Sequence, residues 1–130
     1  EAILNFSRNK FNLVVISNQP DLSRGLITEK FLLENLLQVR NEIPLTMAFF
    51  CPHLKIDHCN CRKPKCGSIL KFRKLYPRSY EKELFIGDQE TDALCAKELN
   101  IPFLKVCSST SLFNNIADSL SSEKKLSLRI

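Results

Sequence analysis

Phe11-Asn-Leu-Val-Val-Ile-Ser17, followed by Asn18-Gln-Pro-Asp21, is the stretch that most constrains the fold. A short run of apolar and β-branched residues that ends in turn-forming residues is typical of a buried strand. We therefore expect a strand over Phe11–Ser17 and a loop that begins at Asn18.

Downstream of this stretch, apolar runs alternate with segments of helical character. Further strands are predicted over Leu45–Phe50, Glu83–Ile86 and Pro102–Val106. Helices are predicted over Thr28–Arg40 with Thr28 as N-cap, Gly67–Leu75, Gln89–Leu99 and, on a weaker pattern, Leu112–Leu120. The polar tail Ser121–Ile130 is expected to fray. Strands that alternate with helices through short connections predict an α/β fold around a parallel sheet.

Polar side chains follow three of the predicted strands. Ser17 and Asn18 end the first strand, Cys51 ends the second and Asp88 ends the third. In parallel sheets, binding groups gather at the carboxyl ends of the strands. The sequence therefore predicts a site at this edge of the sheet.

Composition narrows the class of protein. With 130 residues and 44% apolar content, we expect one domain over residues 1–120, in a soluble cytoplasmic protein without a membrane span or signal peptide. The net charge of +5 favours an anionic partner. Nucleic acid is disfavoured, because the basic residues are scattered and aromatic residues do not alternate with them.

Cysteine and histidine are concentrated in one loop, which reads Cys51-Pro-His53-Leu-Lys-Ile-Asp-His-Cys59-Asn-Cys61. Three thiolates and one imidazole suit tetrahedral zinc, and a closed set of four ligands is typical of a structural site. His58 is left as an alternative ligand or a solvated side chain, and a reduced loop without metal is the competing interpretation. Cys95 and Cys107 are expected to be small core residues.

Arg62-Lys63-Pro64 follows the loop directly. One interpretation is a solvated basic turn whose proline begins the next helix. The other is that the metal holds two cations over an anion site, with Arg62 as a planar fork and Lys63 as a point charge.

Taken together, C-P-H, C-x-C-R-K-P, a preceding strand that ends S-N-Q and a following G-D-x-x-x-D form a specific pattern. It resembles the zinc-loop phosphatases of the haloacid dehalogenase superfamily, which include heptose-bisphosphate and histidinol-phosphate phosphatases. The resemblance spans roughly residues 3–120, with the zinc loop at residues 51–64. It implies a three-layer α/β sandwich and magnesium-dependent hydrolysis of a small phosphorylated metabolite through an aspartyl-phosphate.

The resemblance also implies roles for individual residues. Ser17 would hydrogen-bond the phosphoryl group, Lys63 would steady its charge, and Asp88 would bind magnesium with support from Asp92. The side chains expected to contact the substrate are Ser17, Asn18, Gln19, Arg24, Arg62 and Lys63. The competing interpretation of Ser17 is an ordinary turn serine, and that of Gly87-Asp88 is the start of a helix, which taken alone fits as well as a metal site.

One motif of the superfamily does not occur. Its nucleophile and general acid lie in a D-x-D at the end of a strand, and no D-x-D occurs in these 130 residues. We therefore expect the chain as given to be inactive, and a version that includes an upstream D-x-D segment to be active. The corresponding strand would lie between Phe11–Ser17 and Glu83–Ile86, and a monomer is expected once that strand is present.

Two features disagree about the substrate. The short zinc loop is very like that of histidinol phosphatases, whereas Arg24-Gly-Leu-Ile-Thr-Glu29 resembles the heptose branch more closely. Gln89 stands where heptose enzymes commonly have a basic residue. Heptose bisphosphate is the favoured substrate and histidinol phosphate the alternative. A non-catalytic phosphate-binding protein is the competing class, and a zinc-finger nucleic-acid module is poorly supported.

Overall fold

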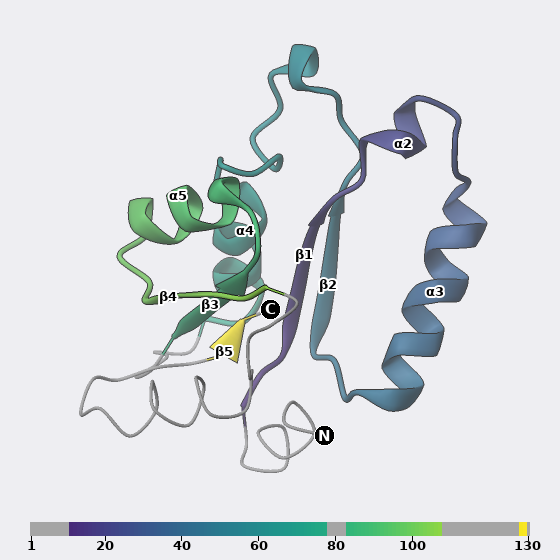
Figure 1. Cartoon of the computed structure of the whole chain (residues 1–130). Coiled ribbons are helices and arrows are strands. Elements are labelled where there is room, and N and C mark those ends of the chain that lie inside the picture. Colours follow the sequence, from purple (N-terminus) through teal and green to yellow (C-terminus); the bar gives the residue numbers. More distant parts are fainter. Residues whose placement is uncertain (1–10, 78–82, 108–127, 130) are drawn as a thin grey trace.

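The computed structural model describes residues 11–77, 83–107 and 128–129 (Figure 1). Along the chain the elements are β1 (Val14–Asn18), α2 (Pro20–Ser23), α3 (Glu29–Glu42), β2 (Met47–Cys51), η1 (Lys55–Asp57), α4 (Gly67–Leu75), β3 (Leu84–Gly87), α5 (Glu90–Glu98), β4 (Phe103–Lys105) and β5 (Leu128–Arg129). The helix expected over Leu112–Leu120 lies outside the described residues, as does most of the tail. Within the described part of the chain, no helix is long and apolar enough to cross a membrane.

The strands form two parallel groups, which confirms the predicted α/β class. β1 pairs with β2, and β3 lies between β4 and β5. In the first group Asn18 lies opposite Cys51, and the Gln19 amide donates to the Cys51 carbonyl at 2.7 Å. This register places the end of β1 directly beside the first residue of the metal loop.

The end of the chain differs from the expected frayed tail at the two tail residues that the structure describes. Leu128–Arg129 does not fray but forms β5, which pairs with β3 and lies between β3 and β1 (Figure 1). β3 is therefore not left with an unpaired edge on that side. The tail is polar, but a strand pairs through its backbone, and an exposed edge of a buried strand offers donors and acceptors to any extended segment.

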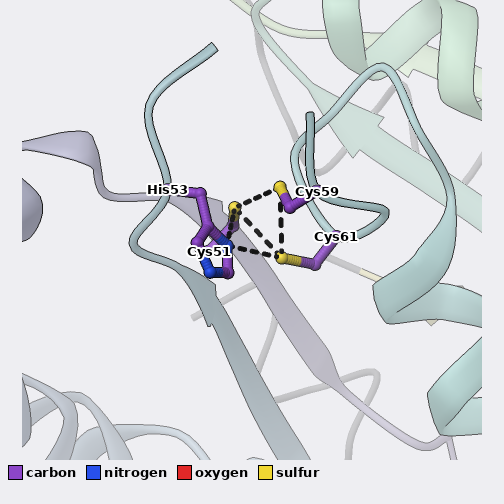
Figure 2. A group of neighbouring side chains, drawn as sticks. All are labelled: Cys51, His53, Cys59 and Cys61. Carbon is purple, nitrogen blue, oxygen red and sulfur yellow. Dashed lines mark hydrogen bonds between the residues drawn. The ribbon is translucent and has the colours of Figure 1, made fainter. Parts of the chain in front are cut away.

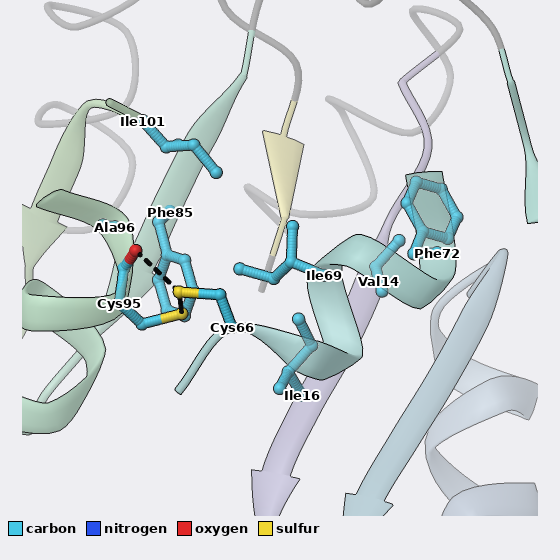
Figure 3. Packing of buried hydrophobic residues seen from close by; sticks show 9 residues of the cluster. All are labelled: Val14, Ile16, Cys66, Ile69, Phe72, Phe85, Cys95, Ala96 and Ile101. Atoms are coloured by element: carbon cyan, nitrogen blue, oxygen red, sulfur yellow. Dashed lines mark hydrogen bonds between the residues drawn. The ribbon is translucent and has the colours of Figure 1, made fainter. Parts of the chain in front are cut away.

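The core is built on the alternating side chains of β1 and β3. Val14 and Ile16 of β1 and Phe85 of β3 face α4 and α5, where Ile69 and Phe72 complete the cluster (Figure 3). A second cluster lies on the other face of the strands, around Leu13, Leu84 and Ile86. Because α4 packs against both β1 and β3, it joins the two strand groups.

Helix α3 contributes little to this core. The Thr28 hydroxyl caps it by accepting from the Phe31 amide at 3.1 Å, as predicted. None of its side chains is buried, and Phe31, Leu33 and Leu37 are each more than half exposed. It lies on the far side of the β1–β2 pair from α4 and α5 (Figure 1), so the other helices position the polar edge of the sheet.

The central place of Phe72 can be tested by truncation. Phe72→Ala is expected to lower the free energy of unfolding by about 3–5 kcal/mol, because its ring is only 1% exposed and a cavity would remain. Leu70→Ala on the same helix is the control, with an expected loss below about 1 kcal/mol because Leu70 is 52% exposed. Urea denaturation measures both, and equal losses would contradict the packing described.

Candidate metal and anion site

Four side chains converge at the end of β2. Cys51, His53, Cys59 and Cys61 bring three sulfur atoms and one ring nitrogen within 4.8 Å of one another (Figure 2). The Sγ atom of Cys61 lies 3.2 Å from that of Cys51 and 3.6 Å from that of Cys59. Zinc–sulfur bonds of about 2.3 Å in a tetrahedron would separate the sulfur atoms by about 3.8 Å. The cluster therefore has the donor set and nearly the spacing that a tetrahedral metal requires.

Backbone contacts give the loop its shape. The Asp57 carboxylate accepts from the Leu54 amide at 2.7 Å, and His58 has a left-handed backbone with φ of 47°, which turns the chain back towards Cys59. The Lys65 ammonium donates to the carbonyls of His58 at 3.2 Å and Cys59 at 2.8 Å. These contacts place the Cys59 and Cys61 thiols beside Cys51, the last residue of β2, and His53.

The thiols of the cluster differ in acidity. Burial first, and then the hydrogen bond with Cys61, raise the pKa of Cys51 to about 12. Burial acts in the same direction on Cys59, but hydrogen bonds with the Arg62 backbone and with the neighbouring thiols outweigh it and lower its pKa to about 7. Cys59 is therefore the first of these two to become a thiolate, whereas Cys51 needs a cation beside it.

His58 does not join the ligands. Among the residues that the structure describes, the only group of three or more metal-binding side chains is the one around Cys51. His58 instead lines a neighbouring cavity. Its role as an alternative ligand therefore has no support in the geometry.

Lys63 connects three separate parts of the fold. Its ammonium donates to the Ile16 carbonyl of β1 at 3.0 Å and lies 2.5 Å from the Asp92 carboxylate of α5. Its backbone exchanges two hydrogen bonds with the Asn18 side chain, at 3.0 and 3.2 Å. The loop, the end of β1 and the start of α5 are thereby held around one cation.

Asp92 is buried, with 3% of the residue exposed. One carboxylate oxygen pairs with Lys63, and the other accepts from the Gln89 amide at 3.1 Å, which caps α5. Gly87 permits this approach, because a β-carbon there would collide with the Asp92 carboxylate. The side chain predicted to support magnesium is thus held by a lysine and a helix N-terminus.

A cavity of about 680 Å³ opens beside these residues. The residues singled out from the sequence that line it are Asn18, His58, Cys59, Arg62, Lys63 and Gln89. Arg62 is oriented by its donation to the His53 carbonyl at 3.1 Å. The sequence prediction missed Lys55 and Lys65, which also line the cavity. Their signal was available, since both lysines lie within or next to the metal loop.

Other predicted residues lie near the cavity without lining it. The Ser17 hydroxyl accepts from the Gln19 amide group at 2.9 Å, and neither residue lines the cavity. Arg24 lies at the end of α2 and pairs with Asp21 at 2.9 Å. Asp88 is exposed at the end of β3 and accepts from the Gln89 side chain at 3.0 Å.

The described residues do not form a complete magnesium site. Magnesium takes six oxygen ligands in an octahedron, and several of them are usually water or substrate oxygens. Asp88 offers one carboxylate, but the described side chains include no group of three acidic residues around it. The Cys and His cluster offers the four ligands that a tetrahedral metal takes, whereas the described residues around Asp88 do not offer the oxygen ligands of magnesium.

The ligand set can be tested by elemental analysis. Protein purified without added metal is expected to hold one zinc per chain, and Cys59→Ser to lose most of it, because the set falls to three ligands. Cys107→Ser is the control, since Cys107 is exposed and outside the cluster. Full zinc retention by Cys59→Ser would remove Cys59 from the set.

Neutralising the acidic residue is expected to cost more stability in the buried Lys63–Asp92 pair than in an exposed ion pair. Asp92→Asn is expected to lower the free energy of unfolding by about 3–5 kcal/mol, because Lys63 is left as an uncompensated buried charge. Asparagine still accepts from the Gln89 amide, so the helix cap is retained. Glu34→Gln breaks the exposed pair with Lys30, 3.8 Å apart, and should cost about 0.5 kcal/mol or less. Chemical denaturation of both variants measures the two losses of unfolding free energy. Comparable losses would contradict the importance of the buried pair.

No family model matches the chain. A Thermoplasma volcanium protein named "Probable D-glycero-D-manno-heptose-1,7-bisphosphate 7-phosphatase" is 27% identical, over 79% of this chain and 75% of its own length. A Helicobacter pylori D-glycero-beta-D-manno-heptose-1,7-bisphosphate 7-phosphatase is 35% identical, over 65% of this chain and 52% of its own length. The Blochmanniella floridana histidine biosynthesis bifunctional protein HisB is also 35% identical, over 74% of this chain and 28% of its own length. The chain thus spans three quarters of one relative, half of another and less than a third of the last.

A solved structure shares the fold. The crystal structure of D,D-heptose 1.7-bisphosphate phosphatase from B. bronchiseptica, complexed with magnesium and phosphate, matches with a TM-score of 0.75. The match covers 98% of this chain and 73% of that chain at 21% identity. The sequence matches support the resemblance to heptose-bisphosphate and histidinol-phosphate phosphatases that the motifs indicated, and the shared structure confirms the predicted α/β fold.

Proposed function

We propose that this chain is the phosphate-binding and substrate-recognition part of a magnesium-dependent phosphomonoesterase that acts on a small sugar phosphate. The observation that carries the proposal is the Lys63 ammonium, held between β1, the metal loop and Asp92 at the wall of a basic cavity. Phosphoryl transfer requires positive charge beside the phosphoryl oxygens, and a cation held in advance supplies it without reorganisation.

Ser17 has the hydrogen-bonding state that this role requires. Its oxygen accepts from the Gln19 side chain at 2.9 Å, so its own proton remains available to a further acceptor. A phosphoryl oxygen at the carboxyl end of β1 is such an acceptor. Gln19 is then a positioning residue for Ser17, and its place outside the cavity lining agrees with that role.

The charge of the cavity favours a heptose bisphosphate over histidinol phosphate. Lys55, Arg62 and Lys65 line the cavity, no aspartate or glutamate does, and these three have no acidic partner in the described part of the chain. A second phosphate on the substrate would meet this excess of positive charge. The amine of histidinol phosphate is a cation and would be repelled.

Two metal ions belong to the proposal. Zinc would be held by Cys51, His53, Cys59 and Cys61, where it orders the loop that carries Arg62 and Lys63. Magnesium, with Asp88 as one ligand, would neutralise charge on the phosphoryl oxygens. We also place the reaction in the cytoplasm and assign no nucleic-acid or membrane partner. The heptose phosphatase of shared fold was crystallised with magnesium and phosphate, which supports this part of the proposal.

The attacking carboxylate is not among these residues. Hydrolysis forms a bond from a nucleophile to phosphorus and breaks the ester bond, whose oxygen then takes a proton. Asp92 cannot attack, since Lys63 and the Gln89 amide hold both of its oxygens. Because the 130 residues contain no D-x-D, a phosphate-binding protein without catalysis is the second candidate function.

A kinetic experiment separates these functions. The chain is expressed with any coding sequence that precedes Glu1, and hydrolysis of heptose bisphosphate and of histidinol phosphate is followed with magnesium. We expect kcat/KM to favour heptose bisphosphate by about tenfold or more, the effect of one favourable charge contact. Lys63→Ala should lower kcat by about 10²–10³, the cost of one transition-state contact. Lys71→Ala on the exposed face of α4 is the control and should have no effect.

Three other outcomes would count against parts of the proposal. Phosphate binding without turnover would favour the non-catalytic function. A preference for histidinol phosphate would contradict the charge argument. An unchanged kcat in Lys63→Ala would remove this lysine from the site.

A further inference from the structure

Two cysteines outside the metal cluster lie against each other in the core. Cys66 is the N-cap of α4 and Cys95 lies in α5, and only 5% and 1% of these residues are exposed. Their Sγ atoms are 2.9 Å apart, with the two side chains pointing towards one another (Figure 3). A disulfide has an S–S bond of about 2.05 Å, so the sulfur atoms need to approach by only about 0.9 Å.

The surroundings do not explain this approach in another way. The Cys66 thiol donates to the Cys95 carbonyl at 3.3 Å, and the Cys95 thiol lies 3.9 Å from the Lys65 carbonyl, which are weak contacts. Among the described residues, neither thiol belongs to a group of three or more metal-binding side chains. The pair is therefore not part of a metal site, and the contact between the two sulfur atoms is a thiol–thiol hydrogen bond donated by Cys95.

We propose that Cys66 and Cys95 form an intrachain disulfide when the protein meets a peroxide or a small disulfide oxidant. With hydrogen peroxide, the two thiols give up two protons and two electrons, one S–S bond forms, and the peroxide is reduced to two molecules of water. With a disulfide oxidant, the same electrons and protons yield two thiols of the oxidant. The inference is independent of the proposed phosphatase activity.

The position of the bond predicts its effect. Cys66 follows Lys63 by three residues, and Cys95 follows Asp92 by three residues. A bond between them joins the same two segments that the Lys63–Asp92 ion pair joins. Oxidation is therefore expected to stabilise the native arrangement and to leave the ion pair in place.

The reaction is expected to be slow. Burial raises the pKa of both thiols, and the neighbouring Glu98 carboxylate raises that of Cys66 further, against the lowering effect of the Cys95 hydrogen bond. Because the thiolate is the form that attacks, little of either cysteine reacts at neutral pH, and the rate should rise with pH. Cys66, at the first turn of α4, is the more exposed of the two.

Peptide mapping of the zinc-loaded chain tests the proposal. Reduced protein is treated with hydrogen peroxide or oxidised glutathione, free thiols are alkylated, and the protein is digested with trypsin. Cleavage after Lys65, Lys71, Lys82 and Lys97 gives residues 66–71 and 83–97, each with one cysteine. We expect these two peptides to be recovered joined, with the loss of two hydrogen atoms, and the melting temperature to rise by about 5 °C or more.

Two variants serve as controls for the peptide mapping. Cys107→Ser removes an exposed thiol and should give the same joined peptides and the same thermal shift. Cys95→Ala should give no joined peptide and no shift, and its circular dichroism before oxidation shows whether it is folded. Recovery of both peptides as separate alkylated species, under conditions that oxidise Cys107, would overturn the proposal. A bond from Cys66 or Cys95 to a cysteine of the metal loop would overturn it as well.

Discussion

The buried ion pair between Lys63 and Asp92 is the interaction on which the arrangement of this edge depends. Lys63 arrives from the metal loop and Asp92 from α5, and the same ammonium also contacts the carbonyl of Ile16 in β1. An ion pair with so little exposure is costly to form and more costly to break on one side. Three segments that are distant in the sequence are therefore held in one geometry at the wall of the basic cavity.

The metal loop supplies the rest of that geometry by a different route. From Pro52 to Lys65 it has no buried apolar side chain, so burial cannot order it. A series of backbone contacts holds it, the four clustered Cys and His side chains would add a metal, and Arg62 is oriented by the His53 carbonyl. The orientation of the Arg62 guanidinium therefore depends on the order of the cluster that contains His53.

The sequence predicted local features better than it predicted contacts between segments that are distant along the chain. Gly67–Leu75 has the predicted helix bounds, and the four metal ligands converge as their spacing indicated. Two short elements, α2 and η1, were missed because four and three residues are too few to show a period. The pairing of β5 depends on contacts across the fold, so only the fold could place Leu128–Arg129 beside β3. The sequence predicted that Asp92 supports a metal ion. The order of residues along the chain did not predict its ion pair with Lys63.

The metal loop contains a short segment with a predicted metal ligand at each end, and this arrangement affects how the cavity lining can change. The segment from Leu54 to His58 begins after one ligand, His53, and ends before another, Cys59. Insertions or deletions there would alter one wall of the cavity while both ends stay tethered, and Lys63 lies beyond them. For the proposed phosphatase function, this separation means that substitutions at these few positions would alter contacts with the leaving group and leave Lys63 in place.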